Sequence, residues 1–128
     1  MSVSGAWSGV YHFMNGQMSG SFLITLQESG STLSGMTEEP DTFGIFGGHV
    51  VYATLSGQRT ENSVVFEKVF EDAPRGLPAI TYVGVVNADE TKIEGDWIVP
   101  GMMSGAFKMD RRGSGVGEAV KRGVTVDR

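Results

Sequence analysis

Three tyrosines and one tryptophan are the side chains best suited to contact a ligand in this chain. Tyr11, Tyr52 and Tyr82 fall near the middle of three segments in which apolar and polar residues alternate, and Trp97 lies near the end of another. A tyrosine that points into a folded domain needs a hydrogen-bond partner for its hydroxyl, or a ligand that supplies one. These four residues are therefore candidate ligand contacts.

A lysine joins them because of its neighbours. Lys68 shares one face of an alternating segment with Phe66 and Phe70. If Lys68 points inward, it needs a carboxylate partner or an anionic ligand, because an unpaired charge is costly to bury. Charged side chains normally reach solvent, so the outward orientation is favoured. The complete candidate set is Tyr11, Tyr52, Tyr82, Trp97 and Lys68.

Other kinds of chemistry have little support in the sequence. The chain has no cysteine, which excludes disulfides and thiolate catalysis. His12 and His49 are too few for a zinc site. Glu38, Glu39 and Asp41 lack the spacing of a calcium loop, so we interpret them as a solvated acidic loop. With no Gly-x-Ser-x-Gly motif either, we predict no catalytic residue, no metal and no cofactor.

The elements that would position these residues are β-strands. Period-two alternation recurs in short runs separated by turn residues, and no window of the body has a helical period. Short strands without crossover helices pair mostly antiparallel, and eight of them remove their exposed edges by closing into a barrel. We therefore predict an all-β antiparallel meander barrel, with a β-sandwich as the alternative. The predicted strands are 5–14, 19–28, 31–37, 48–57, 62–70, 79–87, 91–99 and 104–111.

The links between strands indicate which end of the barrel carries the functional site. In a meander, the links after odd-numbered strands lie at one end of the barrel and the links after even-numbered strands lie at the other. The links after even-numbered strands are short polar turns, which we place at 29–30, 58–61 and 88–90. The links after odd-numbered strands are longer and more apolar. Apolar side chains gathered at one end would plug the mouth, border a ligand entrance or form a contact patch. Glycines between them favour a mobile lid. The candidate lid or mouth residues are Phe43, Ile45, Phe46, Met102 and Met103.

Charge divides the chain into a barrel domain, 1–112, and a basic Gly-containing tail, 113–128. Residues 1–110 carry 13 acidic and 5 basic side chains, whereas residues 111–128 carry 2 and 5, which together give the net charge of −5. Arg111 and Arg112 are counted with the tail, which we expect to be solvated or to lie on an acidic body. An acidic body without a basic stripe argues against nucleic acid as a partner. No signal peptide and no apolar membrane span is visible, so we expect a cytoplasmic protein, free or as a homo-oligomer.

Several short motifs resemble the layout of avidin-like barrels and, more loosely, of lipocalin-like eight-stranded barrels. They are Gly5-Ala6-Trp7, Ser31-Thr32-Leu33-Ser34-Gly35, Tyr82-Val83-Gly84 and Ile93-Glu94-Gly95-Asp96-Trp97. The resemblance implies a barrel with a tryptophan near the floor and a ligand at the open end. It does not extend to biotin, because Ser8-Gly9 stands where avidins place an asparagine contact and the final strand lacks their Trp and Asp pattern.

The leading functional hypothesis is a barrel that binds a small apolar or aromatic molecule. The alternative is a protein-interaction or assembly module that uses the Met- and Phe-rich loop end. An enzyme built on the barrel scaffold is third, because no catalytic constellation is visible.

Overall fold

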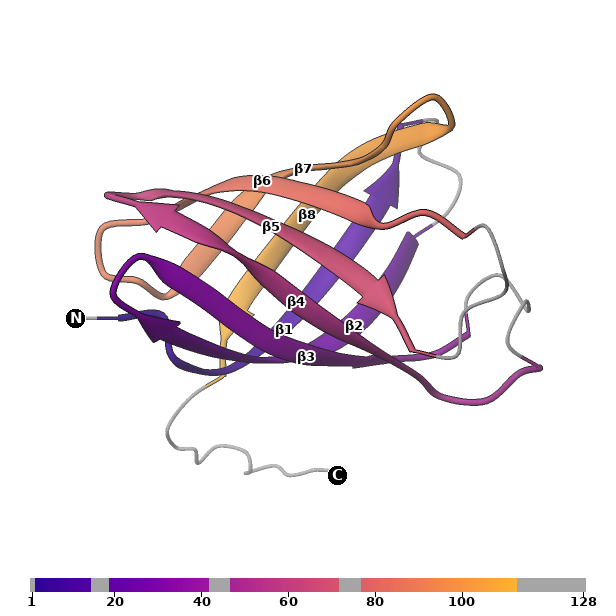
Figure 1. The fold of residues 1–128 in the computed structure, drawn as a ribbon, viewed down its shortest axis with the longest axis horizontal. Helices are drawn as coiled ribbons and strands as arrows, with labels where there is room; N and C mark the ends of the chain where they lie inside the picture. Colours follow the sequence, from indigo (N-terminus) through magenta and orange to yellow (C-terminus); the bar gives the residue numbers. More distant parts are fainter. Residues whose placement is uncertain (1, 15–18, 42–46, 72–76, 113–128) are drawn as a thin grey trace.

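The fold is a closed barrel of eight antiparallel strands in meander order. The computed structural model describes residues 2–14, 19–41, 47–71 and 77–112. Each strand pairs with the next, and β8 pairs with β1 (Figure 1). Among the described residues no helix is present that could cross a membrane. The prediction of an all-β meander barrel is confirmed. The strands are β1 (Gly5–Phe13), β2 (Ser19–Ser29), β3 (Thr32–Glu39), β4 (Val51–Thr60), β5 (Ser63–Phe70), β6 (Ile80–Val86), β7 (Lys92–Val99) and β8 (Met103–Arg111).

Alternation places one side of every strand in the interior. In β2, Phe22, Ile24 and Leu26 are buried while their neighbours face out. The middle of the barrel is filled by aromatic rings: Tyr82 stacks on Phe66 at a centroid distance of 5.1 Å and meets the edge of Phe107 at 5.1 Å. Aromatic pairs in these geometries add to the free energy of burial. The barrel is therefore packed through its middle and is not a pore.

Trp7 closes the end at which the even-numbered links lie. Its side chain is fully buried, and its indole N–H donates to the Val3 carbonyl at 2.9 Å. The guanidinium of Arg111 lies 4.8 Å from the Trp7 ring and donates to the carbonyls of Ser2, Ser4 and Glu90. By charge Arg111 groups with the tail, but it ends β8, in agreement with the predicted strand 104–111, and it contributes to this floor. Residues 113–128 lie outside the described residues.

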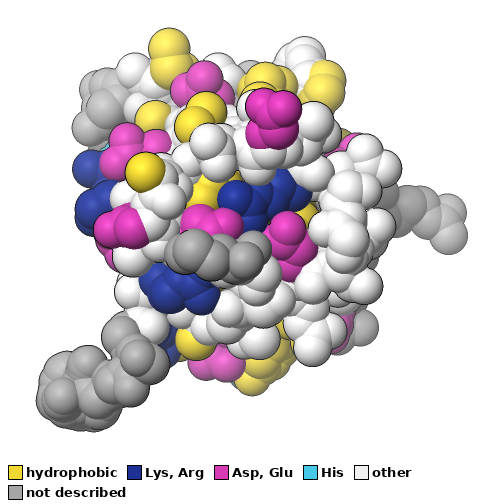
Figure 2. Space-filling model, turned by 90° about the vertical axis from the view of Figure 1, so that its left-hand side faces the viewer, with side chains coloured by type: hydrophobic (Ala, Val, Ile, Leu, Met, Phe, Trp, Pro, Cys, Tyr) yellow, Lys and Arg dark blue, Asp and Glu magenta, His cyan; other side chains and the backbone are white. Residues whose placement is uncertain are grey.

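A charged network covers the same end. Arg59 forms ion pairs with Glu28 at 3.1 Å and with Glu90 at 2.7 Å. Desolvation lowers the pKa of Arg59, but hydrogen bonds to Glu90 and Glu28 and their charges outweigh it and hold the pKa above its ordinary value. In the view onto this end, basic side chains lie near the centre of the face with acidic side chains beside them (Figure 2). The floor is sealed by paired charges over a buried indole.

Most strand ends agree with the sequence prediction to within one residue, but β3 and β4 differ by more, and β4 begins at Val51 where 48 was predicted. The predicted link 58–61 is wrong in extent, because Gln58, Arg59 and Thr60 pair with β5 and the turn is confined to Glu61 and Asn62. Glu61 adopts the left-handed conformation that so tight a turn requires (φ 56°). β3 continues past the predicted end at 37 to Glu39. That extension places a carboxylate at the mouth of the barrel.

Candidate binding site at the mouth of the barrel

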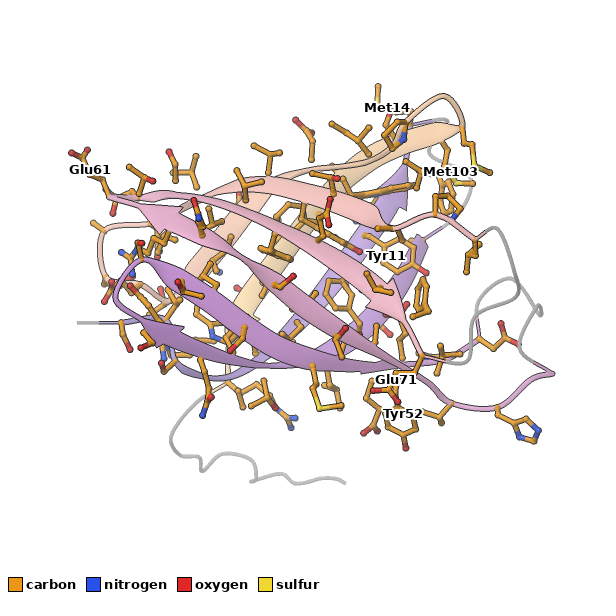
Figure 3. The ribbon with its side chains drawn as sticks, in the orientation of Figure 1. Tyr11, Met14, Tyr52, Glu61, Glu71 and Met103 are labelled. Carbon is orange, nitrogen blue, oxygen red and sulfur yellow. The ribbon has the colours of Figure 1, made fainter. Side chains whose placement is uncertain are left out.

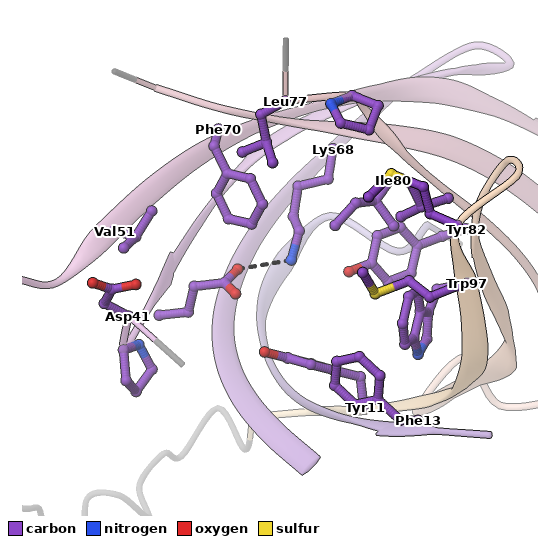
Figure 4. A pocket seen from close by; sticks show the side chains of 16 residues that line it. Tyr11, Phe13, Asp41, Val51, Lys68, Phe70, Leu77, Ile80, Tyr82 and Trp97 are labelled. Atoms are coloured by element: carbon purple, nitrogen blue, oxygen red, sulfur yellow. Dashed lines mark hydrogen bonds and ion pairs between the residues drawn. The ribbon is translucent and has the colours of Figure 1, made fainter. Parts of the chain in front are cut away.

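A small cavity lies at the end opposite Trp7, where the odd-numbered strands finish. Its volume is about 80 Å³, and most of its lining is aromatic or aliphatic. Tyr11, Lys68, Tyr82 and Trp97 all line it, and their side chains converge from four strands (Figure 4). The cavity ends at the aromatic rings that fill the middle of the barrel. Four of the five candidate ligand contacts therefore lie together.

Lys68 and Glu39 form a buried ion pair in this cavity. Lys68 Nζ donates to Glu39 Oε2 at 2.8 Å, and the two residues are 1% and 4% exposed. The Thr37 hydroxyl donates to the same oxygen at 3.4 Å. The favoured outward orientation of Lys68 is wrong, as is the interpretation of Glu39 as part of a solvated loop. Each charge is buried because the other neutralises it.

Aromatic faces surround the ammonium group. Lys68 Nζ lies 4.8 Å from the ring centroid of Phe22, 4.9 Å from Phe70, 5.3 Å from Tyr82 and 5.7 Å from Tyr11. The negative face of an aromatic ring attracts a cation within about 6 Å. Together with Glu39, the rings make this position favourable for one positive charge in otherwise apolar surroundings.

The two inward tyrosines and the tryptophan are held by specific contacts. The ring of Tyr11 packs against Gly20, its register partner on β2, at a position that a Cβ would occupy. Burial raises the pKa of the Tyr82 hydroxyl, and the negative charge of Glu39 raises it further, so Tyr82 stays protonated. The indole N–H of Trp97 donates to the His12 carbonyl at 3.0 Å. These contacts fix Tyr11 and Trp97 beside the cavity, and the stack on Phe66 fixes the ring of Tyr82.

Tyr52 does not belong to the cavity. It lies on the outer wall, 47% exposed, because Val51 and Ala53 occupy the inward positions of β4 (Figure 3). Met102 and Met103 line the cavity at its rim. The other candidate lid residues, Phe43, Ile45 and Phe46, lie outside the described residues.

Sequence reasoning did not anticipate Glu39 as the partner of Lys68 or Phe22 as a neighbour of its ammonium group. Phe70 was expected on the same strand face as Lys68, and its ring lies 4.9 Å from Lys68 Nζ. The alternation of Leu33 and Thr37 continues inward to Glu39, and this was the one available signal. The signal is weak because a polar residue at an inward position resembles the start of a loop.

A second hollow, of about 450 Å³, lies on the outer wall beside the cavity. The pairing of β2 with β3 stops at Leu23 and Glu38, so the mouth end of β2 pairs only with β1. Glu39 and Pro40 line both the hollow and the mouth cavity. The wall of the barrel is therefore thin on the carboxylate side of the ion pair.

No family model and no curated protein sequence matches this chain. Within the described residues, no three His, Cys, Asp or Glu side chains come close enough together to hold a metal ion. The fold itself defines the class: a closed eight-stranded antiparallel barrel, an architecture compatible with that of avidin-like and lipocalin-like barrels. The particular site is an apolar cavity with one buried ion pair.

Proposed function

We propose that the barrel binds a small, uncharged, largely apolar molecule in the mouth cavity. The observation that carries this proposal is the buried Lys68–Glu39 pair, which places a polar contact in a cavity whose lining is mostly apolar, with Asp41 as the other charged residue. Ligand sites commonly combine apolar walls with a few well-placed polar groups that fix orientation. The ammonium has donors for a ligand oxygen, and the carboxylate can accept from a ligand hydroxyl.

The charge of the pair favours a neutral ligand. An anion would meet the Glu39 carboxylate, and a cation would meet the Lys68 ammonium, so either would disturb a pair whose members sit 2.8 Å apart. Breaking a buried pair is strongly unfavourable because it leaves an uncompensated charge. A neutral molecule with one polar atom satisfies the site without that cost.

The cavity volume favours a small ligand. A dry cavity of about 150 Å³ accommodates benzene, and the volume here is about 80 Å³. A ring-sized ligand therefore requires movement at the rim. Met102 and Met103 provide it, because unbranched thioether side chains adapt their shape at low cost.

The test is a ligand titration followed by amide NMR, with cinnamyl alcohol as a neutral probe. We expect shifts to concentrate around Tyr11, Lys68 and Trp97 and to spare Trp7 at the floor. Met103→Trp should fill the rim and abolish these shifts, whereas the matched variant Val65→Trp, on the outer wall, should leave them unchanged. Shifts centred on the outer wall, or equal effects of the two variants, would contradict the proposal.

One observation favours the alternative, a protein-interaction module. Met14 and Met102 are 78% and 63% exposed at the mouth end, and flexible exposed methionines suit protein contacts. Native mass spectrometry of protein purified from its host distinguishes the two functions. A retained small molecule lost in Met103→Trp favours the cavity, and a retained protein lost in Met14→Ser favours the rim.

A further inference from the structure

Among the described residues that line the cavity, the Lys68 amine lies beside both a proton acceptor and an apolar space. We propose that Lys68 captures small apolar aldehydes as a protonated imine, with Glu39 as its counter-ion. This inference rests on the proposed function, since the aldehyde enters the same cavity. It specifies the ligand class further: a neutral carbonyl compound whose carbon chain points toward Met102 and Met103.

The proton transfers of this reaction are served by the observed hydrogen bond. Glu39 Oε2, 2.8 Å from Lys68 Nζ, accepts a proton from the ammonium and frees its lone pair. The amine nitrogen bonds to the aldehyde carbon, and a proton moves from that nitrogen to the carbonyl oxygen to give a neutral carbinolamine. Protonated Glu39 then returns its proton to the same oxygen, the C–O bond breaks, and the oxygen leaves as water; the nitrogen ends as a protonated imine beside the Glu39 carboxylate. One ammonium and one aldehyde thus give one iminium and one water, with no change in charge.

The surroundings of Lys68 suit the product as well as the free amine. An iminium carries the same single positive charge at the same atom, so the Glu39 carboxylate and the ring faces of Phe22, Phe70 and Tyr82 continue to stabilise it. An anionic or cationic ligand would instead change the charge of the site. Exclusion of water also protects a reactive intermediate of this kind from hydrolysis.

The other described lysines provide internal controls. Lys92 is half-exposed and pairs with Asp110 on the outer wall, and Lys108 is also exposed there. Neither lines the mouth cavity. A reaction that depends only on amine accessibility should therefore favour these two residues over Lys68.

The experiment treats the full chain with cinnamaldehyde and sodium cyanoborohydride and maps the reduced adducts by peptide mass spectrometry. Positioning should label Lys68 faster than Lys92 and Lys108 by about tenfold or more. Lys68→Arg, which keeps the charge, should lose that adduct while Lys92 and Lys108 react as before. Labelling of Lys68 that is no faster than that of the exposed lysines overturns the proposal.

Two further measurements separate this proposal from the binding function and from a merely structural pair. Cinnamyl alcohol has the same carbon skeleton as cinnamaldehyde but cannot form an imine. If the alcohol binds in the cavity but cinnamaldehyde does not label Lys68 selectively, the aldehyde proposal is refuted and the proposed binding function is supported. Without reductant, the conjugated protonated imine should absorb at a longer wavelength than free cinnamaldehyde at neutral pH. Glu39→Gln removes the charge that stabilises the iminium, so the imine should lose its proton at neutral pH and its band should move to shorter wavelength. A band that stays in place excludes Glu39 as the counter-ion.

Discussion

The Lys68–Glu39 pair yields the sharpest stability prediction. Lys68→Met leaves the Glu39 carboxylate without its counter-charge, and the Thr37 hydroxyl on the paired oxygen is a long contact at 3.4 Å. Glu39→Leu leaves the Lys68 ammonium among aromatic rings without a counter-charge. Removing one member of a buried pair costs about 3–5 kcal/mol, because the remaining charge is desolvated and unpaired. Each single variant should lose that much free energy of unfolding.

The double variant should recover most of the loss. With both charges gone, Met and Leu fill similar space in a site already bounded by apolar side chains. Replacing a buried pair with apolar groups is often neutral or stabilising by about 1–4 kcal/mol. Lys68→Met combined with Glu39→Leu should therefore be close to the wild type in stability, or above it.

Urea unfolding followed by tryptophan fluorescence measures all four states of this cycle. If the free energy of unfolding falls by about 2 kcal/mol per M urea, each single variant should lower the urea concentration at the unfolding midpoint by about 2 M. Lys92→Met serves as the control, because its exposed pair with Asp110 should contribute little that can be measured. A double variant that loses as much as the two singles together would refute the reasoning, since the residues would then act independently.

Three further predictions concern the floor and the tyrosines. In urea unfolding, Trp7→Ala should cost about 3–5 kcal/mol of unfolding free energy, because it truncates a fully buried side chain. Trp97→Phe should lose about one hydrogen bond, roughly 0.5–1.5 kcal/mol. A larger loss for Trp97→Phe than for Trp7→Ala would contradict the assignment of the two ends. Arg111→Met removes donors from three carbonyls and should speed amide hydrogen exchange at the start of β1 while sparing the mouth. The pKa of Tyr82 is raised on folding, so its contribution to stability is complete below about pH 10 and declines above it by about 1.4 kcal/mol per pH unit. Tyr82→Phe should flatten that decline in unfolding measured from about pH 9 to 11, and Tyr52→Phe, on the outer wall, should not.

The barrel could be predicted from sequence because its signals are local. In β2 and β7 the inward residues are apolar at every second position, so these two strands can be recognised from their own residues alone. The errors lie where polarity misleads. Residues 58–60 resemble a turn because they are polar, yet they complete β4, and Arg59 is held there by Glu28 and Glu90.

The site depended on information that a local pattern does not contain. β4 carries apolar residues on both faces, so the inward direction of Val51 and the outward direction of Tyr52 cannot be read from alternation alone. Lys68 and Glu39 are 29 positions apart and lie on strands separated by β4. Their meeting depends on the stagger of three strands, which only the closed barrel fixes.

The two ends of the barrel therefore invite different explanations. At the floor, Trp7 and Arg111 bury a large ring and satisfy three carbonyl groups, so stability accounts for both residues. At the mouth, stability does not account for Lys68 and Glu39, because apolar side chains of similar size would serve the fold as well or better. A pair that folding does not require, placed against a small cavity, supports the proposal that a ligand binds there. The mouth is therefore the end at which to test for function, and a doubly substituted barrel that folds but no longer binds cinnamyl alcohol would separate stability from ligand binding.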